Sequence, residues 1–130
     1  MEFPERYIKR GKFTLHSGEV SDRLYDVNAM LTDKFWLDYV LNNVPRGFSY
    51  AGIATAGAII ASHFVPYAIV KDKELKGKLE GDYCLIDDVC TTENSLRRAI
   101  EIIGREPSYV FVVVDRRREK KMKVNSFFEV

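Results

Sequence analysis

The chain has 130 residues, which is enough for one domain with a modest hydrophobic core, and we treat residues 1–130 as that domain. Hydrophobic residues make up 46% of it and charged residues 30%, which is typical of a folded globular protein and argues against disorder. The 20 basic and 19 acidic residues leave a net charge of +1, so the chain as a whole has no strong attraction to nucleic acid or to a membrane surface.

The N-terminal region predicts a polar start followed by two short strands. Residues 1–12 are polar and mixed, and they predict at most one helical turn. FTLHSG, residues 13–18, predicts a strand that enters a turn at its Ser-Gly pair. RLYDVNAM, residues 23–30, alternates apolar and polar side chains and predicts a second strand.

A helix is expected next. Thr32 or Asp33 can cap its first turn, and its apolar side chains continue to about Asn43. Pro45 and Gly47 then end it. Phe35 and Trp36 lie in this helix, and we expect core or dimer contacts from them rather than stacking on a ligand.

From residue 49 onward, strands alternate with helices. The expected elements are strands at 49–55, 66–71, 83–88, 108–116 and 127–130, helices at 56–64 and 93–104, and a loop or hairpin at 72–82. The strands are continuous apolar runs, which is typical of a parallel sheet covered on both faces. The sequence therefore predicts an α/β fold with a central, mostly parallel sheet and helices on both faces.

Polar residues follow the carboxyl end of each central strand, where ligands bind in such folds. They are Thr55–Gly57, Lys71, Asp87–Asp88 and Asp115–Arg116. We expect these strand ends to converge on one crevice.

The stretch CLIDDVCTTENSL, residues 84–96, carries the most chemistry. A turn between a strand and a helix N-terminus exposes amide groups that favour phosphate, and Thr91, Thr92 and Ser95 add hydroxyl donors. Two aspartates beside a phosphate site suit a ligand with sugar hydroxyls, so the pattern indicates a ribose phosphate. In the alternative interpretation, Asp88 and Thr92 only satisfy amides of the turn.

Four segments resemble one enzyme family. LIDDVCTTENS resembles the 5-phosphoribosyl-1-pyrophosphate (PRPP) motif of the type I phosphoribosyltransferases. FTLHSGEVSDRLYDV, residues 13–27, resembles a segment of the orotate phosphoribosyltransferases. AGIATAGAIIA resembles their pyrophosphate-binding turn and helix, and VVVDR, residues 112–116, resembles the strand that brings an arginine to orotate. The matches follow the family's order and cover nearly the whole chain.

The resemblance implies a type I phosphoribosyltransferase fold with a small N-terminal hood region, and transfer of the phosphoribosyl group from PRPP to orotate. It implies that Asp87 and Asp88 hold the ribose hydroxyls, and that Arg116, with Thr91 nearby, binds the base. Lys71 and Lys73 are implied to act in catalysis on the leaving pyrophosphate. The remaining implied contacts to PRPP come from Thr91, Thr92, Glu93, Asn94 and Ser95 at the 5-phosphate and from Thr55, Ala56 and Gly57 at the pyrophosphate.

The resemblance also implies Mg²⁺ bound chiefly by PRPP and water, and a homodimer. Cys84 and Cys90 have no neighbours that complete a metal-ligand set, and Cys90 is expected to be a small spacer. We expect a reducing, cytoplasmic compartment because no secretory signal segment is evident. No apolar run approaches the ~20 residues of a membrane span. The basic stretch at residues 116–123 is expected to be a solvated turn rather than a nucleic-acid site.

The sequence departs from the family pattern at the phosphate turn, in the loop and near the N-terminus. Glu93 and Asn94 replace the usual glycines, so the Glu93 carboxylate either points to solvent or faces the phosphate. The loop after residue 71 is short, with lysines but no histidine, and His16 stands where some members have a lysine. These departures leave open a non-catalytic, regulatory binder of PRPP or a nucleotide, and a transferase acting on another base.

Overall fold

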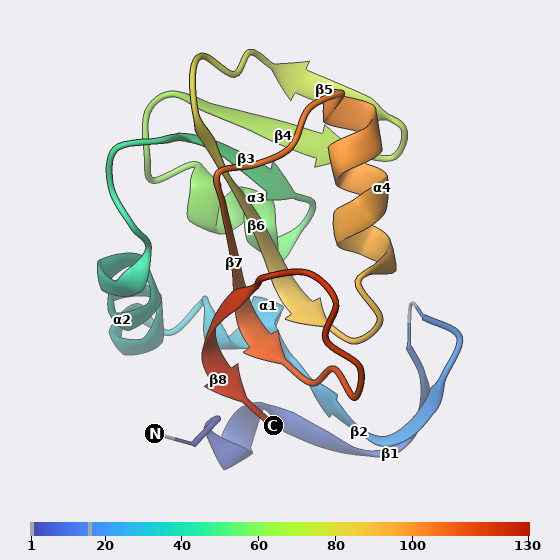
Figure 1. Cartoon of the computed structure of the whole chain (residues 1–130). Helices are drawn as coiled ribbons and strands as arrows, with labels where there is room; N and C mark the ends of the chain where they lie inside the picture. The colour runs from blue at the N-terminus through green and yellow to red at the C-terminus, as the bar shows by residue number, and fades with distance from the viewer. Residues whose placement is uncertain (1, 16) are drawn as a thin grey trace.

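Six strands lie side by side in the main sheet of the computed structural model, which describes residues 2–15 and 17–130 (Figure 1). Their order is β5-β4-β3-β6-β7-β8, with bounds Glu74–Gly77, Tyr67–Lys71, Ser49–Ile53, Tyr83–Cys90, Tyr109–Asp115 and Asn125–Glu129. Every pairing is parallel except the β4–β5 pair. The prediction of a mostly parallel sheet is therefore confirmed.

Helices cover both faces of this sheet because its central strands are apolar on both sides. Ile86 of β6 packs in one hydrophobic cluster with residues of α1 (Val27–Met30), α2 (Lys34–Asn43) and α3 (Ala56–Ala61). Its neighbour Leu85 packs in a second cluster with residues of α4 (Asn94–Ile103). Figure 1 shows α4 and α2 on opposite sides of β6 and β7.

The N-terminal region forms a 3-10 turn, Glu5–Tyr7, and an antiparallel hairpin of β1 (Ile8–Thr14) and β2 (Val20–Tyr25). The first strand thus begins earlier than expected. Figure 1 shows this hairpin across the end of the molecule toward which the β6 and β7 arrows point, so it is the hood region that the resemblance implies. The expectation for His16 lies outside the described residues.

The strand expected at residues 23–30 is wrong in its second half. Residues Val27–Met30 form helix α1, because the Asp26 side chain accepts a hydrogen bond from the Ala29 amide (3.1 Å) and caps the turn. The cap expected for α2 is confirmed at Asp33, whose side chain accepts from the Phe35 amide.

The segment after β4 is a tight hairpin. Lys71 pairs with Glu74, so Asp72 and Lys73 alone form the turn, and Asp72 has a φ of 57°. The hairpin alternative for residues 72–82 is therefore confirmed for residues 72–77, which turn and pair with β4, whereas residues 78–82 form neither helix nor strand.

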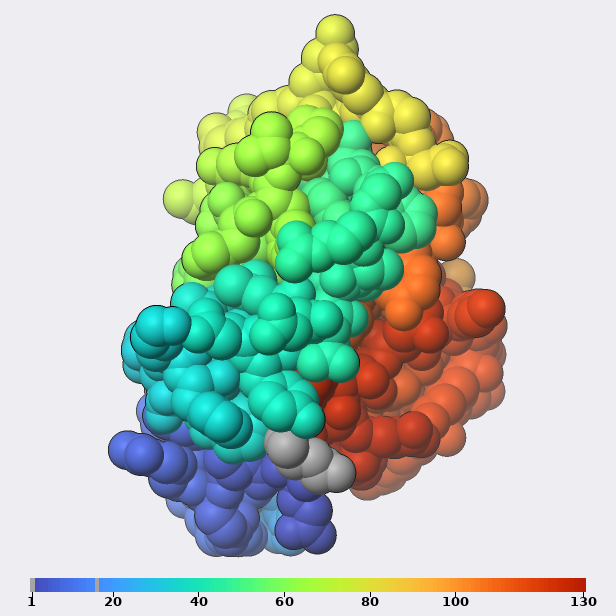
Figure 2. Space-filling view, turned by 90° about the vertical axis from the view of Figure 1, so that its left-hand side faces the viewer, coloured from blue at the N-terminus to red at the C-terminus, as the bar shows by residue number. Residues whose placement is uncertain are grey.

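Aromatic side chains of one helix, α2, and one strand, β8, pack together on the side opposite α4. Trp36 of α2 packs against Phe128 of β8, and Tyr39 packs edge-on against Phe127. Figure 2 shows the region of α2 beside the C-terminal strand on this face. The core contact expected for Trp36 is thus present. Among the described residues, no helix has the length and apolar character needed to cross a membrane.

Candidate active site

The carboxyl ends of β3, β4, β6 and β7 surround a cavity of about 700 Å³ beneath the hood hairpin. Seven of the residues singled out in the sequence line it, namely Thr55, Lys71, Asp87, Asp88, Thr91, Ser95 and Arg116. A smaller cavity of about 110 Å³ adjoins it at the turn before α4, where Thr92, Glu93 and Asn94 join Asp87, Thr91 and Ser95. The predicted crevice at the strand ends therefore exists.

Three predicted residues line neither cavity. Ala56 and Gly57 are buried at the start of α3, and Lys73 is exposed in the β4–β5 turn. Gly57 is required for packing, because a Cβ there would lie 2.3 Å from the Ile86 carbonyl oxygen of β6. A backbone contact from Ala56 and Gly57 to a ligand stays a prediction.

The two aspartates lie within β6, not in a turn after it, because β6 continues to Cys90 and pairs with β7 to its end. This corrects the strand end expected at residue 88. Asp87 is buried and Asp88 is half-buried. The Asp88 amide donates to Asp87 Oδ1 at 2.8 Å, and the Val89 amide donates to Asp88 Oδ1 at 2.7 Å.

Burial, and then the neighbouring Asp88 carboxylate, raises the pKa of Asp87 well above its ordinary value. Two carboxylates so close together favour a proton, a hydroxyl donor or a cation between or beside them. The pair is therefore suited to accept hydrogen bonds from the hydroxyl groups of a sugar.

The turn at residues 91–95 leads directly into α4, whose first amides have no helical acceptor. Arg98 lies one turn further along α4 and lines both cavities. Arg98 was not among the site residues predicted from the sequence. Its four-residue spacing from Asn94 was the available signal, because that spacing puts both on one helix face.

Arg116 is held by the hood. Its Nη2 donates to Ser21 Oγ at 2.9 Å, its Nη1 donates to the Arg23 carbonyl at 3.4 Å, and its guanidinium lies 4.9 Å from the centre of the Tyr25 ring. A planar guanidinium that is fixed in this way can pair with a carboxylate or with carbonyl oxygens of a flat ligand.

Glu93 corrects the expectation of a solvent-facing carboxylate, because only 3% of it is exposed. One carboxylate oxygen accepts from Arg97, and the other accepts from Arg117 and from the Lys121 and Met122 amides. Burial alone would raise the Glu93 pKa, but the two amides and the two arginines together lower it to about 2. The carboxylate thus stays ionised inside the protein, and its negative charge is compensated by the two arginines and the two amides.

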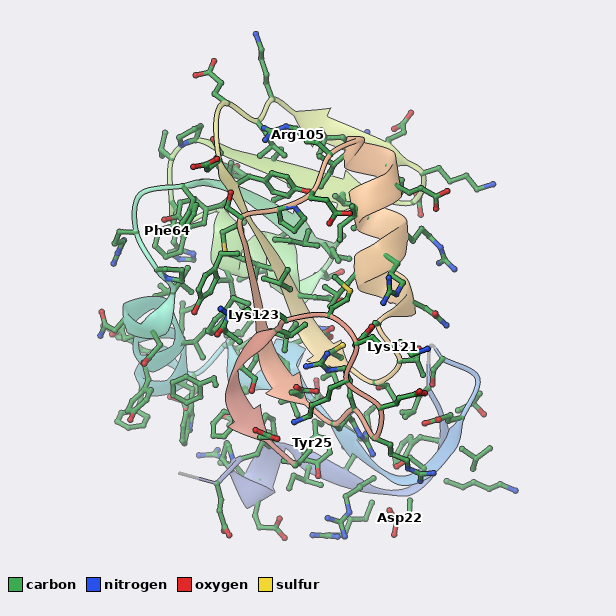
Figure 3. All side chains as sticks on the ribbon, in the orientation of Figure 1. Asp22, Tyr25, Phe64, Arg105, Lys121 and Lys123 are labelled. Atoms are coloured by element: carbon green, nitrogen blue, oxygen red, sulfur yellow. The ribbon has the colours of Figure 1, made fainter. Side chains whose placement is uncertain are left out.

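The expectation that the whole stretch 116–123 is a solvated turn is wrong at Arg117. Its side chain is buried and forms a two-pronged pair with Asp115, with 2.9 Å from Nε to Oδ1 and 2.8 Å from Nη2 to Oδ2. Arg118, Glu119, Lys120 and Lys121 are exposed, as expected. Figure 3 shows Lys121 near the start of α4, where its backbone meets Glu93.

Cys90 fits the expected role of a spacer. It is buried, and burial raises the pKa of its thiol to about 11, so that the reactive thiolate is disfavoured at neutral pH.

The donor set of the cavity suits a magnesium ion that arrives with a phosphate ligand. Among residues 2–15 and 17–130, no group of three or more His, Cys, Asp or Glu side chains could hold a metal ion. Asp87 and Asp88 supply carboxylate oxygens at the cavity wall, and Mg²⁺ commonly takes its other ligands from phosphates and water. The residues therefore fit this ion.

No protein-family model matches the chain. It is similar to the orotate phosphoribosyltransferase of Methanosphaera stadtmanae, with 32% identity over 84% of this chain and 75% of the relative. The enzyme of the same name from Ruthia magnifica is 31% identical over 95% of this chain and 72% of the relative.

Solved structures of similar proteins give the same picture of the fold. The crystal structure of orotate phosphoribosyltransferase from Aeropyrum pernix matches with a TM-score of 0.81 at 24% identity, over 95% of this chain and 89% of that one. Adenine phosphoribosyltransferase from Thermoanaerobacter pseudethanolicus matches with a TM-score of 0.67 at 13% identity, over 97% of both chains. At these identities, the likeness establishes the phosphoribosyltransferase fold.

Proposed function

The chain belongs to the orotate phosphoribosyltransferase family, and on that premise we propose that it transfers the phosphoribosyl group from PRPP to orotate. The products are orotidine 5'-monophosphate and pyrophosphate, and the pathway is pyrimidine biosynthesis. The observation that carries the proposal is the single cavity shared by the Asp87–Asp88 pair, the turn at 91–95 and Arg116. In this cavity the sugar would lie beside the aspartates, the phosphate beside the turn and the base beside Arg116.

In the proposed reaction, the bond between the anomeric carbon and the pyrophosphate oxygen breaks, a bond from a ring nitrogen of orotate to the same carbon forms, and the proton of that nitrogen passes to solvent. Asp87 and Asp88 accept hydrogen bonds from the ribose hydroxyls and orient the sugar. The transition state is cation-like at the sugar, so nearby carboxylates stabilise it, and alignment of the two partners provides much of the remaining rate.

The 5-phosphate is proposed to bind at the turn before α4. The free amides of the first helical turn and the hydroxyls of Thr91, Thr92 and Ser95 all donate to anions. Arg98 lies on the wall between the two cavities and adds a positive charge. The small cavity therefore supplies both hydrogen-bond donors and charge for a phosphate.

The leaving pyrophosphate is proposed to lie near Thr55 and Lys71, at the ends of β3 and β4. When bound with PRPP, Mg²⁺ supplies further neutralisation of the pyrophosphate charge. Lys73 is exposed in the β4–β5 turn and lines neither cavity, so we assign it to the cavity of the partner subunit in a homodimer.

We propose that the homodimer forms through α2, where one aromatic side chain is exposed. Phe35 is 60% exposed and packs edge-on against Trp36, which makes it a candidate contact between copies. Light scattering should give twice the monomer mass for the wild type and a monomer for Phe35→Glu. Two free, buried cysteines are compatible with the proposed cytoplasmic compartment.

A second candidate is a non-catalytic binder of PRPP or a nucleotide. The two-residue β4–β5 turn favours it, because such a turn is too short to fold over a bound pyrophosphate. The preserved aspartates and Arg116 would then serve binding alone.

Pyrophosphate release from PRPP–Mg²⁺ tests both candidates. The assay is run with orotate, uracil, adenine, guanine, hypoxanthine and no base. Release with orotate alone supports the proposal, and release with another base changes the substrate. Absence of release, combined with stabilisation of the protein by PRPP against heat, would replace the enzyme with the binder.

A further inference from the structure

One buried carboxylate connects the phosphate end of the cavity to the base end. Glu93 belongs to the turn at residues 91–95 and has a φ of 70°, in the left-handed region that favours glycine. A residue other than glycine that is held in this strained backbone conformation needs compensating contacts. Glu93 has four hydrogen-bonding partners, of which three come from the segment after β7.

The contacts of Glu93 order that segment. Its Oε2 accepts from Arg117 Nη1 at 2.7 Å, from the Lys121 amide at 2.8 Å and from the Met122 amide at 3.0 Å. Arg117 Nη1 also donates to the Met122 carbonyl at 2.9 Å, which closes the loop from residue 117 to residue 122 around the guanidinium.

Arg116 lies at the root of this loop, between Asp115 and Arg117, whose side chains form the buried pair. Its amide donates to the Cys90 carbonyl at 3.0 Å, just before the phosphate turn. The backbone of Arg116 is therefore fixed from both sides, by the Asp115–Arg117 pair and by the end of β6. Since Arg117 is anchored on Glu93, the phosphate turn and the base-side arginine form one connected unit.

The charged groups of this unit compensate one another. Glu93, Asp115 and Arg117 are each at most 7% exposed, and two surface cations extend the network, Arg97 beside Glu93 and Lys120 at 4.0 Å from Asp115. Removing one member of a buried ion network leaves its partner without compensation, which costs far more than the loss of a surface pair.

We propose that Glu93 and Arg117 are positioning residues that hold Arg116 in the base part of the cavity at a set place relative to the phosphate turn. This inference rests on the proposed function, because the base part is defined by the assignment of Arg116 to orotate. In this arrangement Glu93 does not contact PRPP through its carboxylate. At a position where the family pattern has glycine, Glu93 instead links the phosphate turn to the segment that carries Arg116.

Glu93→Gly separates the two roles of this residue. Glycine accepts the φ of the turn without strain, so the phosphate site keeps its shape, while the anchor of Arg117 is lost. We expect KM for orotate to rise about tenfold and KM for PRPP to change by less than about threefold, in line with coupling of this kind. Arg117→Lys keeps the charge and loses the two-pronged geometry, so it should show the same pattern.

Lys34→Gln is the matched control, because it removes an exposed ion pair on α2 and leaves both cavities intact. It should leave both KM values unchanged. Equal increases of the two KM values in Glu93→Gly would overturn the inference. So would a lower melting temperature with both KM values unchanged, because that result would make the network purely structural.

Hydrogen exchange of the Lys121 and Met122 amides adds a readout that needs no turnover. Both amides donate to Glu93, so their exchange should accelerate in Glu93→Gly and stay slow in Lys34→Gln. Unchanged exchange would overturn the link. Absence of orotate-dependent turnover in the wild type would instead defeat the proposed function, and with it the role of the link in orotate binding, even where exchange accelerates.

Discussion

Asp87 shows how function can oppose stability at a single residue. Its carboxyl group is buried beside another carboxylate, and the raised pKa means that ionisation at neutral pH destabilises the folded state. Each carboxylate accepts the backbone amide of the next residue, but the side-chain oxygen of an asparagine could accept it too, so this contact does not require two charges. Hydroxyl groups of a bound sugar would donate hydrogen bonds to the two carboxylates and so reduce this destabilisation.

Asp87→Asn should therefore stabilise the free protein and abolish most of its activity. We expect a gain of about 1 kcal/mol at pH 7, because the amide removes the buried charge. The gain should shrink toward acidic pH, where the native carboxyl group becomes protonated. Urea unfolding at pH 7 and pH 4, together with the pyrophosphate assay, measures both effects. Lower stability with full activity would contradict the assignment.

Glu93 gives the opposite pH dependence. Its pKa falls from an ordinary 4.5 to about 2 in the folded protein, and Arg117 also lowers the pKa of Asp115. A lowered carboxyl pKa contributes stability above the ordinary value, and this contribution is lost as the pH falls toward the folded one. The wild type should therefore lose its advantage over Glu93→Gln between about pH 4.5 and pH 2. Urea unfolding at pH 7, 4.5 and 3 measures this difference, and a constant difference would contradict it.

At the scale of elements, the strand predictions were correct where burial of an apolar run is enough to identify a strand. The apolar runs of β3, β6 and β7 could be located because both of their faces are covered, and β4 could be located although only one of its faces is buried. Helix α1 was missed because four residues are too few to show helical periodicity, and the Asp26 cap decided its conformation. The end of β6 was misplaced because pairing with β7 continues through polar residues.

The candidate site was predictable to the extent that local motifs carry it. The turn before α4 and the aspartates are contiguous in sequence, so their pattern was readable. The contact between Glu93 and Arg117 was not, because Arg117 lies 24 residues away and meets Glu93 only after β7 joins β6. Arg98 was missed because its four-residue spacing from Asn94 places it on the same helix face but does not show that this face borders a cavity.

Helix α4 offers a direct test of that residue. Arg98→Ala should raise KM for PRPP about fivefold and leave KM for orotate nearly unchanged, because a partly exposed cation on a phosphate is worth about 1 kcal/mol. Arg105→Ala, at the other end of the helix beside Tyr83, is the control and should leave both values unchanged. Equal effects of the two variants on KM for PRPP would show that Arg98 acts only through general charge.

At the scale of the whole molecule, the cavity lies between two units with different structural support. The parallel sheet forms its floor and is buried in two hydrophobic clusters. The hood hairpin forms its other wall and is tied to the sheet partly through Arg116, Ser21 and Tyr25. A base that binds Arg116 would therefore also affect the contacts through which Arg116 joins the hood to the sheet.

The two-residue turn between β4 and β5 has a consequence for the time course of the reaction. Enzymes that fold a long loop over their substrate are often limited by the reopening of that loop, which slows in viscous solvent. This short turn cannot close over the cavity in that way, so we expect kcat to be the same in buffer and in sucrose solutions of several times its viscosity. A fall of kcat in proportion to viscosity would reveal a moving cover supplied elsewhere. The same openness admits water to the sugar cation, so PRPP should be slowly hydrolysed when no base is present.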